Sequence, residues 1–340
     1  MKAAVLRQIQ KPLEIEDVDV PALNPDEVLV KTQACGICRT DLHFLQGEMK
    51  AGKLPLILGH EASGTVESYG TNVEGWEKGD RVIPYRDFTC GKCYSCTTGH
   101  EEVCYSPLGK LGFNRDGGFA EYFKAPARFL IRLPETVTFQ DGGTVTCAGQ
   151  TAYHAIKTRA HAGLGQTLMV LGAGGIGLQV LQYAKVAGAS VLVADRSGRK
   201  LEFASKFGPD HLIDLTSHDI PSEVKRLTDG RGADIVVDTT ASGKVIGVGL
   251  ASLRKAGRMV LLGASEDPIP SITCSNMLAT EHEVLGSRSS TKKELTEATA
   301  LVASGKIKSI VTETYKLEQI NEALERLRQG AVLGREALIF

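Results

Sequence analysis

Four cysteines with metal-ligand spacing lie in one short segment of the chain. Cys90, Cys93, Cys96 and Cys104 form the pattern C-x2-C-x2-C-x7-C within TCGKCYSCTTGHEEVC. Four thiolates so close in sequence match the tetrahedral shell of a structural zinc ion, in which no coordination position stays open for a substrate. Free thiols, disulfides and a cysteine-ligated iron–sulfur cluster are the alternatives. The spacing therefore predicts a structural zinc site in this segment.

A second set of zinc-type ligands is dispersed along the chain. It comprises Cys38 in CGICRTDLH, His60 and Glu61 in GHE, and Cys147 in TCAGQT. Two thiolates and one imidazole would give a metal site with three protein ligands and a fourth position for water or a substrate oxygen. A buried cysteine is also an ordinary small apolar residue, and a single histidine is often only a hydrogen-bonded structural residue. Spacing alone leaves both interpretations open.

A glycine-rich turn points to a nucleotide. Gly172, Gly174 and Gly177 of GAGGIG have the spacing G-x-G-x-x-G between the β-branched run 167–171 and a helical segment at 178–188. In this context the first glycine permits the tight turn, and the second lets the backbone approach a pyrophosphate at the helix N-terminus. The third lets the helix and strand pack closely. We therefore predict a dinucleotide-binding turn here.

The end of the next expected strand indicates which dinucleotide is bound. Asp195 lies 23 residues after Gly172, where a carboxylate can accept hydrogen bonds from both ribose hydroxyls of NAD and repel a 2′-phosphate. Arg196 and Lys200 follow closely, and cations at these positions would tolerate NADP. NAD is favoured, and use of NADP stays open.

The segments that position these motifs show two different sequence patterns. Up to residue 148, short β-type runs are separated by Gly, Pro, Asn and Asp, as at 27–32, 64–69 and 81–84. From 149 to 288, β-branched runs alternate with helical segments. These runs are 167–171, 191–195, 211–215, 234–240, 258–263 and 283–287. This alternation predicts a parallel, doubly wound sheet with helices on both faces.

The last fifty residues extend beyond this sheet. They contain a helical segment at 292–304, a strand near 310, a second helical segment at 317–330 and a closing strand at 336–340. Because the six expected strands end by residue 288, we expect this tail to rejoin the first domain. The predicted domains are therefore 1–148 completed by 289–340, and 149–288.

Composition limits the partners and the compartment. Lys and Arg total 39 against 40 Asp and Glu, so the formal charge is -1, and no long charged run marks a nucleic-acid-binding surface. No apolar stretch reaches the ~18 residues of a membrane span. Arg7 and Gln8 interrupt the N-terminal apolar run, so no signal peptide is expected. We expect a cytoplasmic protein that acts on a small molecule and binds neither nucleic acid nor membrane.

The motifs together resemble one enzyme family. The segments CRTDLH at 38–43 and GHEASGTVESYGTNV at 59–73, the four-cysteine segment and GAGGIG at 172–177 are similar to those of zinc-dependent alcohol dehydrogenases of the medium-chain dehydrogenase/reductase superfamily. This resemblance implies an α/β fold with a GroES-like β-rich catalytic domain and a Rossmann coenzyme domain. It also implies two zinc ions per chain, reversible hydride transfer between a primary or secondary alcohol and NAD, and a homotetramer, with a homodimer as the alternative.

The resemblance also assigns roles to single residues. Cys38, His60 and Cys147 would bind the catalytic zinc, at which Glu61 is an exchangeable fourth ligand. Asp41 would orient His60, whereas Cys35 would not be a ligand. Thr40 would receive the alcohol proton and His43 would pass it to solvent. The remaining implied cofactor contacts are Gly175 in the turn, Arg39 and Arg335 at the pyrophosphate, and Thr151 at the nicotinamide.

One segment departs from the family pattern. PYRDFTC at 84–90 lies where the family places pocket-lining side chains, and it carries Arg86 and Asp87 where apolar or aromatic residues are common. One hypothesis is that Arg86 reaches the substrate pocket and favours a carboxylate or other anionic group. The alternative is that Arg86 points to solvent or pairs with Asp87. Phe44, Leu45 and Leu111 are further pocket candidates from their neighbourhood alone.

Two other functions compete with a simple alcohol dehydrogenase. A polyol or semialdehyde dehydrogenase of the same superfamily would share the catalytic site, but polyol dehydrogenases often lack the four-cysteine loop. A non-catalytic sensor that binds zinc and NAD would need no proton path, so the presence of both Thr40 and His43 argues against it.

Overall fold

The computed structural model describes residues 1–216, 219–269 and 272–340 of the chain. These residues separate into two units. Unit 1 comprises Met1–Cys147, Ser290–Gly305 and Ser309–Phe340, and unit 2 comprises Ala148–Ser289 and Lys306–Lys308. Within the described ranges, no helix is both long enough and apolar enough to cross a membrane.

A mixed β-sheet forms the centre of unit 1. Its strand order is β10-β6-β5-β3-β18-β17, and β9 also pairs with β3. The strands are β3 Glu27–Ile37, β5 Glu61–Tyr69, β6 Arg81–Pro84, β9 Tyr122–Pro126, β10 Leu130–Arg132, β17 Val311–Tyr315 and β18 Arg335–Ile339. The runs predicted at 27–32, 64–69 and 81–84 lie inside β3, β5 and β6. The first two strands are longer than predicted, and their added residues carry the chain to Cys38 and Glu61.

Smaller elements complete unit 1. β1 Lys2–Leu6 pairs with β2 Glu14–Asp17 and β4 Leu56–Ile57, and β7 Asp87–Phe88 pairs with β8 Gly109–Lys110. The α-helices are α1 Arg39–Gln46, α2 Tyr94–Thr97, α3 Phe139–Thr144, α10 Lys292–Ala303 and α11 Ile320–Arg328. Short 3-10 turns lie at Glu101–Val103, Ala127–Phe129 and Leu317–Gln319, and a π-helical turn spans Val145–Gly149.

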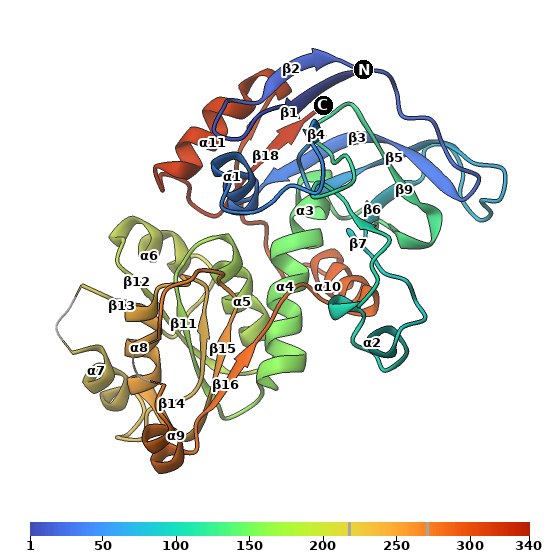
Figure 1. The fold of residues 1–340 in the computed structure, drawn as a ribbon. Helices are drawn as coiled ribbons and strands as arrows, with labels where there is room; N and C mark the ends of the chain where they lie inside the picture. The colour runs from blue at the N-terminus through green and yellow to red at the C-terminus, as the bar shows by residue number, and fades with distance from the viewer. Residues whose placement is uncertain (217–218, 270–271) are drawn as a thin grey trace. The chain divides into compact units, whose positions relative to one another are not determined.

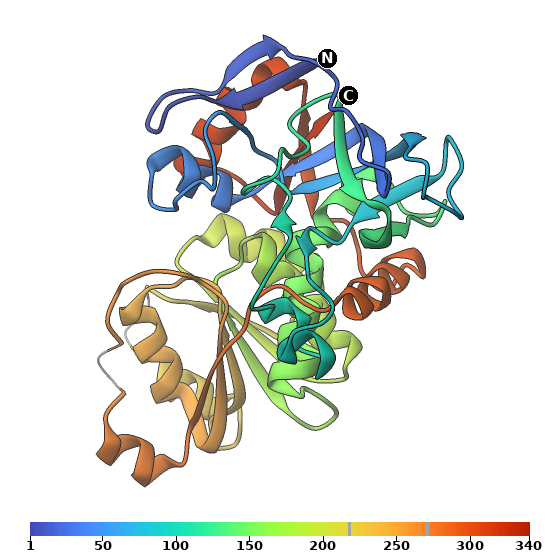
Figure 2. The same ribbon diagram turned by 45° about the vertical axis from the view of Figure 1, so that its right-hand side comes forward.

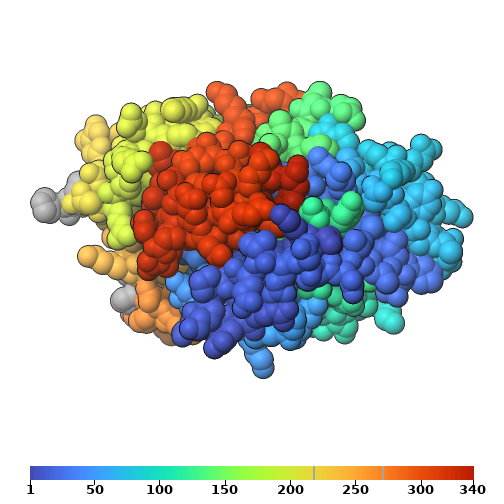
Figure 3. Space-filling view, turned by 90° about the horizontal axis from the view of Figure 1, so that it is seen from above, coloured from blue at the N-terminus to red at the C-terminus, as the bar shows by residue number. Residues whose placement is uncertain are grey.

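The C-terminal segment is built into the N-terminal half of unit 1. β18 pairs antiparallel with β3, with Leu338 opposite Cys35, so the two strands lie side by side (Figure 1). The Asn321 side chain of α11 exchanges two hydrogen bonds with the backbone of Leu13, each 2.9 Å long. In the space-filling view the red C-terminal surface lies against the blue N-terminal surface (Figure 3). The end of the chain therefore holds the strand that leads into the Cys38 segment.

Unit 2 is a parallel sheet with the order β13-β12-β11-β14-β15-β16. Its strands are β11 Thr167–Leu171, β12 Ser190–Asp195, β13 His211–Asp214, β14 Ala233–Asp238, β15 Leu253–Leu261 and β16 Glu283–Gly286. The central strand β14 is buried along its whole length, as expected of a parallel strand covered on both faces. The predicted doubly wound α/β fold is confirmed.

Helices cover the two faces of this sheet. They are α4 Gln150–His154, α5 Gly175–Val186, α6 Gly198–Ser205, α7 Ile220–Arg226 and α8 Gly243–Ser252, and a π-helical segment spans Ala155–Ala160. α9 Cys274–Thr280 has no buried residue. α5 packs with α4 and α7 packs with α8, and the two pairs lie on opposite faces (Figures 1 and 2). Met169, Val236 and Met259 belong to a buried core in which the sheet packs against Ile220 and Val224 of α7 and Ile246 and Leu250 of α8.

Candidate functional site

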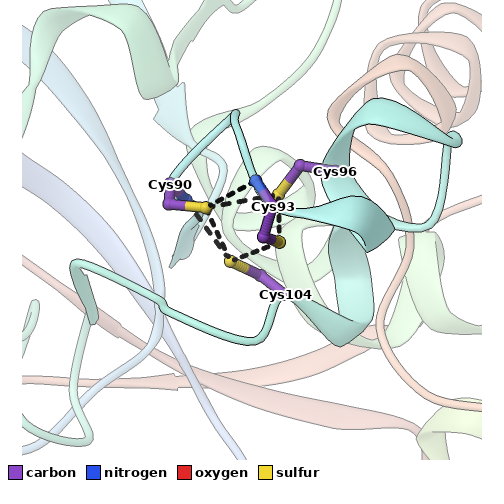
Figure 4. A group of neighbouring side chains, drawn as sticks. All are labelled: Cys90, Cys93, Cys96 and Cys104. Atoms are coloured by element: carbon purple, nitrogen blue, oxygen red, sulfur yellow. Dashed lines mark hydrogen bonds between the residues drawn. The ribbon is translucent and has the colours of Figure 1, made fainter.

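The four-cysteine segment folds into a tight sulfur cluster (Figure 4). The Sγ atoms of its cysteines all lie within 4.8 Å of one another. The shortest separation is 3.5 Å, between Cys93 and Cys96, and the Cys90–Cys96 separation is 3.9 Å. Sulfur atoms around a tetrahedral zinc ion with Zn–S bonds of about 2.3 Å lie ~3.8 Å apart. The cluster therefore has the dimensions of a closed zinc site.

Local backbone geometry supports charged thiolates in this loop. The backbone N–H of Cys93 donates to Cys90 Sγ at 3.3 Å, and that of Cys90 lies 3.4 Å from Cys104 Sγ. The backbone N–H groups of Cys96 and Tyr105 lower the pKa of Cys93 to about 6. A thiolate is the metal-binding form of cysteine. The backbone of the loop therefore favours the thiolate form of Cys93, whereas burial raises the pKa of Cys96 to about 12.

Cys38, His60, Glu61 and Cys147 form a second cluster, with ligand atoms within 4.8 Å of one another. All four side chains are at most 5% exposed. Cys38 is the N-cap of α1, and Glu61 begins β5, with His60 directly before it. Cys147 lies in the π-helical turn that follows α3, and such turns often occur at functional sites. Three separate segments thus bring the four side chains together. We call this set the Cys38 cluster.

The Cys38 cluster contains buried polar atoms without partners. His60 Nε2 and Glu61 Oε2 lack a hydrogen bond among the described residues, whereas His60 Nδ1 faces Asp41 and Glu61 Oε1 faces Arg335. Buried polar atoms in folded proteins are nearly always satisfied, so each exception needs an explanation. A cation among two thiolates, an imidazole and a carboxylate would satisfy them, and this donor set suits zinc. The residues therefore fit the metal that the sequence predicts.

Asp41 positions both the helix and the imidazole. Its Oδ2 accepts a hydrogen bond of 2.9 Å from the backbone N–H of Cys38, and its Oδ1 lies 3.3 Å from His60 Nδ1. Burial by itself lowers the pKa of His60, but the charges of Asp41 and Cys38 outweigh burial and raise it to about 9. The surroundings of the ring thus favour a positive charge, whether a proton or a metal ion.

Glu61 is held between a glycine and an arginine. Burial raises the pKa of Glu61 to about 7, and Arg335 Nη2 lies 2.9 Å from its Oε1. A Cβ atom on Gly36 would lie 2.2 Å from Glu61 Oε2, so only glycine leaves space for this carboxylate. Sequence analysis missed Gly36, although it lies in the CGIC segment. It also missed Phe113, whose ring packs edge-on against His60 at 5.2 Å between centroids.

Thr40 and His43 lie on α1 next to the Cys38 cluster. Thr40 Oγ1 lies 3.6 Å from Cys38 Sγ. His43 is one turn further along, its side chain is 26% exposed, and its Nδ1 hydrogen bonds to the Glu48 carboxylate. The two polar side chains thus lead from the buried cluster towards the surface. Sequence analysis missed Glu48, which no motif marks.

The remaining predicted residues of unit 1 differ in how far they are buried. Cys35 is fully buried and its Sγ lies 3.7 Å from the Gly36 carbonyl, outside the Cys38 cluster. Arg39 is exposed at the start of α1. Among the pocket candidates, Leu111 is fully buried and Leu45 is partly buried, and Phe44 packs edge-on against Phe113.

Arg86 is buried rather than solvent-facing. It is 6% exposed, and although burial lowers the pKa of its guanidinium, the charge of Cys147 outweighs burial and raises that pKa. Asp87 Oδ2 is 3.7 Å from Arg86 Nε, which is longer than a hydrogen bond. The interpretation in which Arg86 points to solvent is therefore wrong, whereas the expected pairing with Asp87 is present as an ion pair.

The glycine turn of unit 2 has an open position. Gly172 has φ +97°, and a Cβ atom on Gly177 would lie 1.8 Å from the Gly172 carbonyl oxygen. A Cβ atom on Gly174, the N-cap of α5, would meet nothing within 4 Å. The turn is thus closed on its packing side and open at the helix N-terminus, where a phosphate would bind.

Asp195 reaches this turn from the end of β12. Its two carboxylate oxygens accept hydrogen bonds from the backbone N–H groups of Ala173 (2.8 Å) and Ser197 (2.9 Å). Arg196 is exposed and Lys200 is half-buried on α6. Gly175 is the first residue of α5, and Thr151 lies buried on α4. The turn, the helix N-terminus and the adjacent carboxylate together fit a dinucleotide.

Comparisons with known proteins agree over the whole chain. Residues 24–135 match the alcohol dehydrogenase GroES-like domain family, and residues 175–304 match the zinc-binding dehydrogenase family. The chain is 37% identical to an alcohol dehydrogenase of Geobacillus stearothermophilus, with 99% of each chain covered. It is 36% identical to the NAD-dependent alcohol dehydrogenase of Sulfurisphaera tokodaii, with full coverage of both. The crystal structure of the Aeropyrum pernix alcohol dehydrogenase superposes with a TM-score of 0.92 at 36% identity, with full coverage of both.

Proposed function

We propose that this chain, which belongs to the zinc-dependent alcohol dehydrogenases of the medium-chain dehydrogenase/reductase superfamily, carries out its chemistry at the Cys38 cluster. The reaction is reversible hydride transfer between a primary or secondary alcohol and NAD. One observation carries the assignment of the site: a buried cluster of two thiols, an imidazole and a carboxylate in which His60 Nε2 and Glu61 Oε2 lack a hydrogen-bond partner.

The catalytic zinc ion would be held by Cys38, His60 and Cys147. Bound zinc supplies a Lewis acid that lowers the pKa of a coordinated alcohol hydroxyl and polarises a carbonyl in the reverse direction. The three ligands leave a coordination position open, and the burial of all of them keeps bulk water away from it. Asp41 holds the imidazole ring in its ligating orientation through the 3.3 Å contact.

Glu61 and Arg335 adjust the charge of the site. The Glu61 carboxylate belongs to the cluster and stands ready as an exchangeable ligand. Arg335 neutralises it through the 2.9 Å contact whenever it is not bound to the metal. Arg335 and the exposed Arg39 are also the cations that we assign to the cofactor pyrophosphate.

Thr40 and His43 would carry the proton of the alcohol. The Thr40 hydroxyl lies next to Cys38, so it can accept the substrate proton while donating its own. His43 is half-exposed and hydrogen-bonded to Glu48, and it can release the proton to solvent. Both groups lie on one helix, whose start is fixed by Asp41.

Unit 2 would bind the dinucleotide. The open N-terminus of α5, with Gly174 and Gly175, would hold the pyrophosphate, and Asp195 would bind the ribose hydroxyls and so favour NAD over NADP. We assign Thr151 to the nicotinamide. Arg196 and Lys200 are the cations that decide how strict the preference for NAD is.

The test combines metal analysis with a substrate panel. Purified protein is expected to contain about two zinc ions per chain and to oxidise alcohols with a higher kcat/KM for NAD than for NADP. The panel contains primary, secondary, aromatic and carboxylated alcohols. Binding of NAD without turnover of any alcohol would instead identify a sensor and overturn the proposal.

Three finer assignments follow from family membership. We propose that residues 1–148 and 289–340 form the catalytic domain and 149–288 the coenzyme domain. We also propose a homotetramer, with a homodimer as the alternative, which sedimentation equilibrium distinguishes by mass. Finally, we propose a cytoplasmic location, which fractionation of cells that express the tagged protein would test.

A further inference from the structure

Arg86 places a buried positive charge directly beside the Cys38 cluster. It lies between β6 and β7 and is 6% exposed. Its carbonyl oxygen accepts a 3.0 Å hydrogen bond from the backbone N–H of Leu111, two residues before Phe113, whose ring packs against His60. A guanidinium stays charged in proteins, so its burial is costly unless an anion and hydrogen-bond acceptors surround it. The partners of Arg86 therefore decide what this side chain is for.

The partners that the protein supplies are incomplete. Asp87 Oδ1 is 2.9 Å from Lys110 Nζ, whereas Asp87 Oδ2 is 3.7 Å from Arg86 Nε. Lys110 thus makes the shorter ion pair with this carboxylate. Nε and Nη1 of Arg86 are buried and have no hydrogen-bond partner among the described residues.

The metal ligands do not neutralise this charge in the zinc-loaded enzyme. The thiolates of Cys38 and Cys147 carry two negative charges, which a Zn²⁺ ion balances. Glu61, the acidic member of the cluster, is already 2.9 Å from Arg335. A substrate bound at the open coordination position would therefore meet a guanidinium whose buried Nε and Nη1 have no hydrogen-bond partner among the described residues.

The neighbours of Arg86 hold it in place. Tyr85, the residue before Arg86, is anchored because its Oη donates a 2.7 Å hydrogen bond to the carbonyl of Ser290. Asp87, the residue after Arg86, is anchored because it pairs with Lys110 across the β7–β8 ladder. Because the backbone is fixed on both sides, the guanidinium is preorganised and little ordering accompanies binding.

We infer that Arg86 binds a carboxylate of the substrate, so that the preferred substrates are hydroxy acids and the corresponding aldehyde acids rather than neutral alcohols. The planar guanidinium presents paired N–H donors that match the two oxygens of a carboxylate. The inference rests on the proposed function, because the hydroxyl of the same molecule must lie at the zinc. Arg86 would act on binding and selectivity and would transfer neither a proton nor a hydride.

The test compares acids with uncharged substrates of the same size. kcat/KM is measured for 3-hydroxypropanoate, 4-hydroxybutanoate and 5-hydroxypentanoate and for their primary amides. The wild-type enzyme is expected to prefer the acid by at least about tenfold in one or more pairs, since a charge-assisted contact is lost with the amide. The variant Arg86→Gln should remove this preference by lowering kcat/KM for the acid at least tenfold, while the value for the amide stays within about twofold.

Two further variants separate recognition from a structural role. Arg86→Lys keeps the charge without the paired donors and should retain an intermediate preference. Arg132→Gln is the matched control, because Arg132 is an exposed arginine of the same unit, paired with Asp80 at 2.8 Å. It should leave the preference unchanged. The zinc content of every variant is also measured. If Arg86 served only to hold Cys147 in place, its replacement would lower the zinc content.

Calorimetry separates this inference from the proposed function. The Kd of 4-hydroxybutanoate for the zinc-loaded protein without NAD should rise at least tenfold in Arg86→Gln, whereas the Kd of 4-hydroxybutanamide should not change. The inference is overturned if wild-type enzyme shows no acid preference in any pair, or if Arg86→Gln lowers zinc content and both kcat/KM values together. If neither substrate is oxidised, the proposed function fails, and the two Kd values still decide whether Arg86 binds a carboxylate.

Discussion

The four-cysteine loop and the Cys38 cluster both gather metal-binding atoms within 4.8 Å, but their surroundings differ. The loop is half-exposed and comes from one short segment, and its own backbone N–H groups point at its sulfurs. The Cys38 cluster is buried and comes from three segments. Asp41 and Arg335 are among its charged neighbours.

This difference separates a metal that supports the fold from a metal that performs chemistry. A closed shell of four sulfurs leaves no position for a substrate, so local geometry suffices to build it. A reactive site needs an open position, exclusion of water and a balance of charges. Only distant parts of the chain, packed together, can supply these. The predictions below test this distinction.

The largest effect is expected from a change at the Cys38 cluster. Cys147→Ser should lower kcat by about a thousandfold or more, because a Lewis-acid contribution of several kcal/mol is lost. Metal analysis should show one zinc ion lost per chain, while circular dichroism shows a retained fold. Cys274→Ser, at an exposed cysteine on α9, is the control and should leave both values unchanged. A Cys147→Ser variant with two zinc ions and full activity would contradict the assignment.

The four-cysteine loop should respond in the opposite manner. Cys93→Ser should also release one zinc ion, but it should act on stability rather than on the chemical step. We expect Tm to fall by at least about 5 °C, since 1 kcal/mol corresponds to about 2–4 °C in a domain of this size. The kcat of the remaining folded enzyme should stay within about threefold. If kcat falls as far as in Cys147→Ser, the two clusters do not differ as proposed.

The features that sequence analysis predicted well are those encoded locally. The four cysteines and the glycines of GAGGIG each lie within one short segment, so their spacing is visible in the sequence, although Asp195 and Thr239 from later segments also contact the glycine turn. The strands of unit 2 followed from their β-branched runs for the same reason. The ligand set Cys38, His60 and Cys147 was recognised only through the family resemblance, since nothing in the spacing brings these residues together.

Other parts of the site depend on packing between distant segments. Glu61 meets Arg335 only because β18 pairs with β3, and Gly36 leaves the space for the Glu61 carboxylate. The π-helical turn around Cys147 carries no local signal. Arg86 stayed ambiguous because burial, which excludes a solvent-facing guanidinium, is a property of the folded chain.

A weaker effect on the Cys38 cluster is expected from Asp41→Asn. The variant keeps the size of the side chain but removes the charge that faces His60 Nδ1. Loss of such a carboxylate typically lowers zinc affinity about 10- to 100-fold. Competition with a chelator measures this affinity. Asp219→Asn, which alters the exposed N-cap of α7, controls for a general capping effect. An unchanged zinc affinity would show that Asp41 acts only as the cap of α1.

The glycine turn extends the comparison to unit 2, because it is local like the loop yet keeps an open position like the Cys38 cluster. Gly177→Ala should destabilise the unit by about 1–3 kcal/mol, since its Cβ atom would lie 1.8 Å from the Gly172 carbonyl oxygen.

Gly174→Ala should leave Tm within about 1 °C, because its Cβ atom meets nothing within 4 Å. Its methyl group would instead occupy space that a pyrophosphate requires, so KM for NAD should rise about tenfold, equivalent to about 1.4 kcal/mol of binding. Thermal unfolding and steady-state kinetics of both variants separate the two roles. If Gly174→Ala binds NAD normally, the open position lies outside the path of the pyrophosphate, and another part of the turn must hold it.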